Sequence, residues 1–334
     1  SAPRNVPFPS SVKRAERAYF ARMTTRQMHG DGAALALGLD VGGTATRWCL
    51  RDGECVLARG DGPGFSGVQL HTPAGSAEVA ERVAALAERV LPAARGLRLG
   101  AVVAGVTGVG AGSAALAAML AQAFAVALPR VLVTSDVMIA HRAAFAPGEG
   151  YLVYAGTGSI AAFIDADQVL HRAGGRGVLL DDAGGGYWIA HEALRRIWRR
   201  EDENPGAWRA STLACRLFAK IGGDASIDAV HYLMEHERGE VGRLAFDVAA
   251  CAEEDALARA IMHDAGRELA RLGNAMLHRF GPRPLRVAGG AALLHAQIEA
   301  SFRVQLATPI AVTFAPLDAA AAAADWACAV VASA

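Results

Sequence analysis

The stretch LGLDVGGTATR, residues 37–47, decides how this chain folds. Its apolar beginning predicts a β-strand that reaches Asp40, and its end predicts a second strand after a turn at residues 42–44. Glycines in such a turn let backbone N–H groups approach a ligand closely, because no Cβ stands in the way. The stretch therefore predicts a strand–turn–strand unit whose turn can hold phosphate oxygens.

The second half of the chain opens in the same way. Residues 151–155, YLVYA, predict a strand, residues 156–159, GTGS, a turn, and residues 160–164 another strand. A further short strand is expected in each half, at residues 54–58 and 168–171. One glycine turn between strands is usually only a hairpin, but two at corresponding places indicate an internal duplication. We therefore expect an α/β fold with two related halves.

The segment APGEG, residues 146–150, is typical of a linker between those halves. We expect a first domain over residues 34–147 and a second over residues 148–334, with the final helix, from Asp318 onward, packing back on the first domain in one arrangement. Residues 1–33 lack the apolar region of a secretory signal, so they are expected to form an extension, disordered in one interpretation.

Apolar runs and helical spacing predict the remaining elements. Helices are expected at 78–91, 113–127 and 137–145, strands at 97–104 and 131–134, and a glycine-rich turn at 105–112. Beyond Gly186 the chain is typical of helices, apart from a strand at 285–288 that runs into Gly289 and Gly290.

Composition narrows the classes of function. Lys+Arg and Asp+Glu both total 33, so the net charge is zero, and the chain lacks the positive charge of nucleic-acid-binding proteins. No apolar stretch approaches the roughly 20 residues of a membrane helix. The five cysteines form no CxxC pair and no cluster with zinc spacing, which favours a reducing compartment. We expect a cytoplasmic protein without a nucleic-acid or membrane partner.

Two common nucleotide-binding motifs are excluded. A P-loop needs lysine after glycine, but the chain has only Lys13 and Lys220, and neither follows a glycine. A dinucleotide fold needs GxGxxG after its first strand, and neither residues 38–43 nor residues 105–112 have that spacing. The glycine turns therefore point to a different way of holding phosphates.

Four motifs in order resemble those of sugar kinases in the actin, Hsp70 and hexokinase superfamily. Residues 37–47 resemble the first phosphate motif, residues 155–159 the second, and VAGGA, residues 287–291, the adenosine motif. GGRG, residues 174–177, followed by Asp182 and GGGYWI, resembles the signature of the N-acetylglucosamine kinase branch, within the BadF/BadG/BcrA/BcrD ATPase family. The resemblance extends from about residue 35 to the C-terminus. It implies two ribonuclease H-like (actin-like ATPase) domains with an interdomain cleft.

The resemblance also implies an activity and roles for residues. The activity is ATP-dependent phosphorylation of the 6-hydroxyl of N-acetylglucosamine, with ATP and Mg²⁺ as cofactors and a homodimer as the assembly. Asp136 is the implied general base and also contacts the sugar, while Asp40 faces Mg²⁺ through water. The residues expected to bind ATP and its phosphates are Gly42, Gly43, Thr44, Gly156, Thr157, Gly158, Gly289 and Gly290. The residues expected to bind the sugar, besides Asp136, are Ser66, Ser159, Gly175, Arg176, Gly177 and Asp182.

The chain departs from the family pattern at the sugar. Arg176 stands where N-acetylglucosamine kinases carry tryptophan and glucosamine-kinase-like members can carry arginine, and Ser66 is only the nearest counterpart of a sugar-binding asparagine. A glucosamine kinase and a kinase of a muramic-acid derivative therefore stay open. So does an ATPase that drives a partner protein, although no cysteine lies near the loops that would hold an iron–sulfur cluster. A sugar-binding regulator is disfavoured, since Asp40 and Asp136 are both present and no helix-turn-helix is evident.

Overall fold

The computed structural model describes residues 34–333, and the expected extension at residues 1–33 lies outside them. The described chain divides into two compact units. The first contains residues 34–135 and 320–333, and the second contains Asp136–Ala319. The division falls after Ser135, upstream of the linker-like segment at residues 146–150, and residues 320–333 belong to the first unit.

The first unit is built on a five-stranded mixed sheet with the order β3-β2-β1-β4-β5. The strands are β1 (Leu35–Val41), β2 (Ala45–Asp52), β3 (Cys55–Pro63), β4 (Leu99–Val106) and β5 (Val131–Ser135). Strands β1, β4 and β5 run parallel, while β2 and β3 are antiparallel neighbours on the other side of β1. Residues 37–47 thus form most of the central strand, the turn after it and the start of β2.

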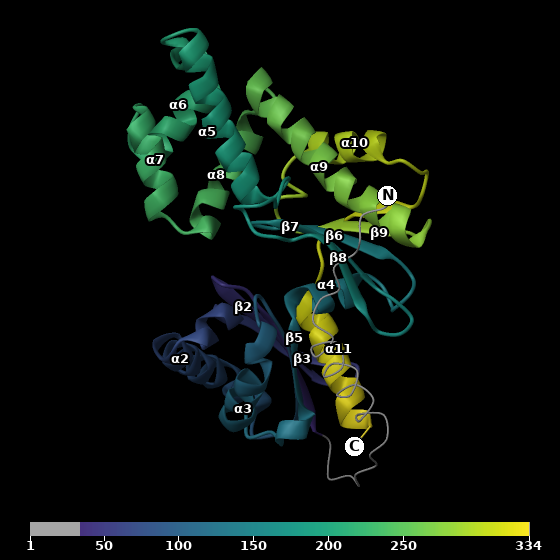
Figure 1. The fold of residues 1–334 in the computed structure, drawn as a ribbon. Helices are drawn as coiled ribbons and strands as arrows, with labels where there is room; N and C mark the ends of the chain where they lie inside the picture. Colours follow the sequence, from purple (N-terminus) through teal and green to yellow (C-terminus); the bar gives the residue numbers. More distant parts are fainter. Residues whose placement is uncertain (1–33, 334) are drawn as a thin grey trace, which may run out of the picture. The chain divides into compact units, whose positions relative to one another are not determined.

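Alternate residues of β1 face two different layers, as the period of a strand requires. Leu35, Leu37 and Leu39 are fully buried against α2 (Pro73–Val90) and α3 (Ser113–Ala123). On the other face, Gly38 meets α11 (Ala319–Ala332), and a Cβ at Gly38 would overlap the backbone of that helix. Figure 1 shows α2 and α3 on one side of this sheet and the yellow α11 on the other.

The second unit repeats the sheet of the first. Its strands are β6 (Tyr151–Ala155), β7 (Ser159–Ile164), β8 (Leu170–Gly174), β9 (Leu285–Ala288) and β10 (Val312–Phe314), in the order β8-β7-β6-β9-β10. Again the first strand, β6, pairs antiparallel with the hairpin strand β7 and parallel with β9, and β9 pairs parallel with β10. The two sheets share one topology, which confirms the internal duplication predicted from the sequence.

Helices make up most of the second unit (Figure 1). They are α4 (Asp136–Ala144), α5 (Gly186–Glu203), α6 (Thr212–Ile221), α7 (Ser226–Glu235), α8 (Arg238–Cys251), α9 (Ala256–Phe280) and α10 (Ala296–Gln305). One face of the sheet packs on a large core with α5, α8 and α9, and the other face packs on α4. Neither α9 nor any other helix within residues 34–333 combines the length and apolar character needed to cross a membrane.

Several elements differ from the sequence expectation in their bounds. Strand β3 runs to Pro63 rather than ending at residue 58, because its polar and glycine-rich end pairs with β2, where Gly60 packs against the indole of Trp48. Helix α2 begins at Pro73, because the Thr72 side chain accepts the Gly75 N–H as an N-cap. Helix α3 ends at Ala123, since the chain turns there and Ala125 takes a positive φ.

Asp255 joins two helices of the second unit by capping both. One carboxylate oxygen accepts the N–H groups of Leu257 and Ala258 at the start of α9, at 2.8 and 3.3 Å. The other accepts the hydroxyl of Ser211, the N-cap of α6, at 2.6 Å and the N–H of Leu213 at 3.2 Å. Burial alone would raise the pKa of Asp255, but these hydrogen bonds outweigh it and hold the pKa below its ordinary value.

Replacement of Asp255 by alanine is expected to lower the free energy of unfolding by roughly 2 kcal/mol, because caps of two helices are lost together. Since the pKa is lowered in the folded state, this contribution is present above the ordinary pKa of about 3.9 and is lost as the pH falls through the folded value. Urea denaturation of the wild type and of Asp255→Ala at several pH values measures both effects. The exposed Asp224→Ala serves as the control, and an equal loss in that variant would contradict the account.

Candidate functional site

The first glycine turn follows β1 and presents unused hydrogen-bond donors. The N–H of Gly42 donates to the carbonyl of Ala45 at 3.0 Å and closes the turn. Within residues 34–333, neither the N–H of Gly43 nor that of Thr44 has a protein acceptor, and both residues are exposed. A Cβ at Gly43 would meet nothing within 4 Å. The turn is therefore a short, exposed main-chain segment whose N–H groups, together with the Thr44 hydroxyl, can donate hydrogen bonds to an anion.

Asp40 lies at the end of β1, directly before this turn. In the sheet it is level with Gly105 of β4, which is in turn level with Thr134 of β5. Asp40 therefore stands at the carboxyl edge of three parallel strands, where α/β sheets hold their ligands. Its side chain is about a quarter exposed and lies 4.0 Å from the guanidinium of Arg47 across the hairpin.

Ser66, a predicted sugar contact, follows β3 and caps a short helical turn, η1 (Gly67–His71). Its hydroxyl donates to the carbonyl of Thr107 at 3.2 Å and accepts the N–H of Val68 at 3.3 Å. The N–H of Thr107 donates to the carbonyl of Val41 at 3.1 Å. Ser66 is thus tied to the loops that follow β1 and β4, and its hydroxyl already has two protein partners.

The second glycine turn follows β6 and has the same form as the first. The N–H of Gly156 donates to the carbonyl of Gly158 at 3.0 Å, and Thr157 is exposed. In the part of the chain that the structure describes, the N–H groups of Thr157 and Gly158 lack a protein acceptor. The carbonyls of Gly156 and Thr157 instead accept N–H groups from the start of α5, at 2.8 and 3.0 Å. Hydrogen bonds from α5 therefore occupy two carbonyls of the turn, while the N–H groups of Thr157 and Gly158 stay available to a ligand.

Asp182 packs against this turn. It is only 7% exposed, takes a positive φ of 58°, and accepts the N–H of Gly177 at 3.1 Å. A Cβ at Gly158 would overlap its carboxylate. Burial raises the pKa of the Asp182 carboxyl, while the hydrogen bond from Gly177 acts in the opposite direction. Asp182 therefore links the predicted sugar loop at residues 175–177 to the second turn.

The other predicted sugar-binding residues of this unit differ in exposure. Gly175 and Gly177 take positive φ values, and Gly175 and Arg176 are exposed at the tip of the loop after β8. Ser159 is buried, and its hydroxyl donates to the carbonyl of Ala183 at 2.7 Å. The Ser159 hydroxyl therefore holds the segment that carries Asp182, rather than facing solvent.

The predicted adenosine motif lies beside the same turn. Gly289 follows β9 with a φ of 97°, and a Cβ there would overlap the backbone of Ala155 at the end of β6. The N–H groups of Ala291 and Ala292 donate to the Ala155 carbonyl, at 2.9 and 3.3 Å. Gly290 is exposed. The second unit thus gathers the second turn, Asp182 and the Gly289–Gly290 turn around the ends of neighbouring strands.

Asp136 begins α4, directly after β5. Its carboxylate accepts the N–H of Val137 at 2.8 Å, and the side chain is partly exposed. A carboxylate is favoured at the start of a helix because of the partial positive charge there. The predicted base is therefore a partly exposed carboxylate held by backbone at the carboxyl end of a parallel strand.

Two glycines that back the turns are not among the predicted site residues, although Gly185 belongs to the GGGYWI motif. Gly64 is buried after β3, and a Cβ there would overlap the backbone of the first turn. Gly185 stands behind the second turn, where a Cβ would lie 2.6 Å from the carbonyl carbon of Gly158. Both approaches join segments far apart in the sequence, so only the structure reveals them.

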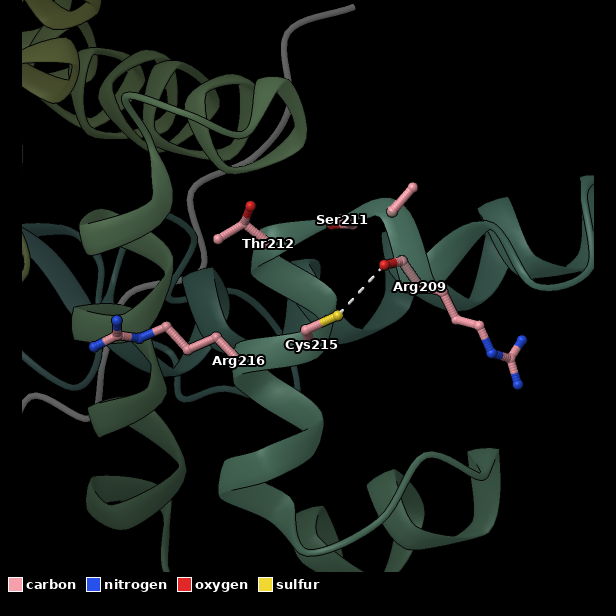
Figure 2. A pocket seen from close by; sticks show the side chains of 6 residues that line it. Arg209, Ser211, Thr212, Cys215 and Arg216 are labelled. Carbon is pink, nitrogen blue, oxygen red and sulfur yellow. Dashed lines mark hydrogen bonds between the residues drawn. The ribbon is translucent and has the colours of Figure 1, made fainter.

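None of the predicted site residues lines the hollow of about 530 Å³ at the start of α6, which is shown in Figure 2. It is lined by Arg209, Ala210, Ser211, Thr212, Cys215 and Arg216. The Arg209 and Arg216 side chains point in opposite directions in Figure 2. Arg216 pairs with Asp247 at 2.7 Å, and the Arg209 guanidinium lies 4.7 Å from the Trp208 ring centroid. The hollow lacks converging free charges and is not assigned to the site.

Known proteins resemble this chain in sequence over the region that carries these motifs. Residues 37–319 match the sequence model described as the BadF/BadG/BcrA/BcrD ATPase family. An N-acetyl-D-glucosamine kinase of Dictyostelium discoideum is 26% identical over 138 residues, which is 40% of this chain and 42% of that protein. The chain therefore matches less than half the length of this curated relative.

Solved structures resemble the chain over most of its length. A candidate N-acetylglucosamine kinase of Chromobacterium violaceum superposes with a TM-score of 0.68 at 23% identity, covering 87% of this chain and 98% of that one. A ROK family glucokinase of Streptomyces griseus, in complex with glucose and AMPPNP, superposes with a TM-score of 0.54 at 16% identity, covering 89% and 98%. At these identities the likeness concerns the fold, and it confirms the expected class of two ribonuclease H-like, actin-like ATPase domains.

The glycines of the two turns are expected to differ in what they tolerate. Gly158→Ala should lower the free energy of unfolding by roughly 1–3 kcal/mol, because its Cβ would overlap the Asp182 carboxylate. Gly43→Ala should change it by less than about 0.5 kcal/mol, because its Cβ would point into open space. Thermal and urea denaturation of both variants measure the difference. Equal losses would show that Asp182 does not support the second turn.

Proposed function

We propose that this chain, which belongs to the BadF/BadG/BcrA/BcrD ATPase family, is an ATP-dependent amino-sugar kinase. The proposed reaction transfers the γ-phosphoryl group of ATP to the 6-hydroxyl of N-acetylglucosamine. One observation carries the proposal. Two glycine turns, at corresponding places in two sheets of identical topology, each leave N–H groups and a threonine hydroxyl without protein partners in the described chain. Such paired donors suit the phosphate chain of a nucleotide.

The proposed mechanism uses positioning and charge more than covalent chemistry, as phosphoryl transfer generally does. The N–H groups at Gly43 and Thr44 and those at Thr157 and Gly158 would hold phosphate oxygens. Asp136 would accept the proton of the sugar 6-hydroxyl while that oxygen attacks the γ-phosphorus and ADP leaves. Gly289 and Gly290 would let the adenosine approach the backbone, since Gly290 presents no side chain to a ligand and Gly289 lets the turn pack against the end of β6.

Asp40 suits a magnesium ion that is held mainly by phosphates and water. Mg²⁺ usually keeps several waters and binds through one or two carboxylates plus substrate phosphates. Among residues 34–333 no three His, Cys, Asp or Glu side chains gather into a metal-binding group, so an all-protein cage is not what the described chain offers. Bound there, Mg²⁺ would neutralise charge on the phosphates during transfer.

The identity of the sugar is proposed from the loop after β8, residues 175–177, and from Asp182 beside it. N-acetylglucosamine is favoured because Gly175, Gly177 and Asp182 match the family pattern and Asp182 holds the loop beside the second turn. Glucosamine is the second candidate, and the exposed Arg176 favours it, since glucosamine-kinase-like members can carry arginine there. The expected homodimer stays a prediction that analytical ultracentrifugation can test.

ADP release tests the proposed activity. With Mg-ATP, the wild type should release ADP only when a sugar is present, among N-acetylglucosamine, glucosamine, N-acetylmannosamine, glucose and N-acetylmuramic acid. In Asp136→Asn, kcat should fall by about 10²–10⁴-fold, because a positioned general base contributes that much. Nucleotide affinity should stay nearly unchanged, and Asp224→Asn should match the wild type. ADP release at the same rate with and without every sugar would instead favour an ATPase that drives a partner protein.

Arg176 is expected to influence the choice between the two amino sugars. Arg176→Ala should change the ratio of kcat/KM for N-acetylglucosamine and glucosamine by about tenfold, a difference of about 1.4 kcal/mol between the two transition states. The KM for ATP should stay the same, because Arg176 lies on the loop after β8 and not on either turn. Parallel kinetics with the two sugars measure the ratio, and an unchanged ratio would remove Arg176 from sugar selection.

A further inference from the structure

The chain after β3 lies directly against the first turn. Gly64 is buried there, and a Cβ at this position would overlap the backbone of residues 42–45. The preceding carbonyl, that of Pro63, accepts the hydroxyl of the fully buried Thr46 at 2.7 Å. Any outward movement of the segment at residues 64–66 would therefore remove the support behind the turn.

The same segment is also fastened to the loop that follows β4. The N–H of Gly67 and the hydroxyl of Ser66 both donate to the Thr107 carbonyl, at 2.9 and 3.2 Å. A Cβ at Gly67 would overlap the backbone of Val109. The segment at residues 64–66 thus lies between two loops that end parallel strands, and it has no room to shift toward either of them.

Three side chains complete a closed ring of hydrogen bonds around this segment. The guanidinium of Arg82, on α2, donates both to the Gly64 carbonyl and to the carboxylate of Glu78, one turn earlier on the same helix. Glu78 also accepts the side-chain N–H of Gln69 at 2.9 Å. The side-chain oxygen of Gln69 accepts the N–H of Ser66 at 2.9 Å. These hydrogen bonds therefore hold the segment at both of its ends, at the Gly64 carbonyl and at the Ser66 N–H.

An ion pair between residues four apart on an exposed helix face usually contributes little. This pair differs because each partner is also bound to the loop, and a planar guanidinium can serve two acceptors at once. Hydrogen bonds from a charged group to a backbone carbonyl are also stronger than neutral ones. The side chains of Arg82 and Glu78 are 35% and 44% exposed, so the ring is only partly screened by water.

We propose that Gln69, Glu78 and Arg82 are positioning residues that brace the segment at residues 64–66 against the first turn and so set the affinity of that turn for nucleotide phosphates. The inference rests on the proposed function, in which the first turn holds phosphate. It adds three residues of α2 and η1 that touch neither the nucleotide nor the sugar. Their effect is transmitted through Gly64 to the backbone of residues 42–45.

The test compares Arg82→Met with Arg89→Met, a matched change on the same helix at an exposed arginine that donates only a long hydrogen bond, of 3.5 Å, to the Asp61 carbonyl among the bonds of the described chain. In Arg82→Met, hydrogen–deuterium exchange in peptides covering residues 42–47 should become faster, and the Kd for Mg-ADP should rise about tenfold, because a charge-assisted bond is lost. Arg89→Met should stay within about twofold of the wild type. Arg82→Lys should fall between, since an ammonium keeps the charge but not the fork.

The outcomes separate the brace from the function on which it rests. In one outcome, the wild type and Arg82→Met bind Mg-ADP equally tightly, and hydrogen exchange at residues 42–47 is unchanged. The proposed positioning role of Gln69, Glu78 and Arg82 is then wrong, and the kinase proposal stands. If the wild type fails to bind Mg-ADP, the proposed function is wrong, and the inference that rests on it is overturned as well. A purely structural role would lower the melting temperature of Arg82→Met and leave the Kd and the local exchange unchanged well below that temperature, which would also overturn the brace.

Discussion

Backbone packed directly on backbone is the constraint on which this structure depends. Behind the first glycine turn lies Gly64, behind the second lies Gly185, and Gly289 lies against the end of β6. At each place a single Cβ would overlap a neighbouring main chain or approach it within 2.6 Å. Because the main chain is held from behind, the N–H groups of each turn can point outward without being used internally. Rigid, unsatisfied donors are what a phosphate-binding turn needs.

The internal duplication repeats this backbone packing in both sheets, so the described chain has two glycine turns of the same form. One turn of bare backbone can bind an anion, but two sheets with one topology, each carrying such a turn after its first strand, offer two sets of donors of the same kind. The carboxylates are placed by the same logic, since Asp40 ends β1 and Asp136 follows β5, both at carboxyl ends of parallel strands. The proposed kinase activity therefore assigns each residue a task that its place in the sheet already favours.

The features that the sequence predicted correctly are local. The two strand–turn–strand units, the short helix from Asp136 and the strand before Gly289 follow from apolar runs and glycine positions within a few residues. The features that it could not predict depend on distant contacts. Gly60 extends β3 because it fits under Trp48, and Gly64 matters only because of the turn about twenty residues before it. The hydroxyls of Ser66 and Ser159 face protein carbonyls, which no local pattern reveals.

The central claim is that the phosphoryl group goes to a sugar and not to water. The most direct measurement uses ATP with heavy oxygen in its γ-phosphoryl group and follows N-acetylglucosamine and glucosamine by mass spectrometry. If the chain is a sugar kinase, a sugar 6-phosphate that carries the heavy oxygens will form in proportion to ADP. Heavy inorganic phosphate beside unmodified sugar would contradict this claim and would identify the chain as an ATPase.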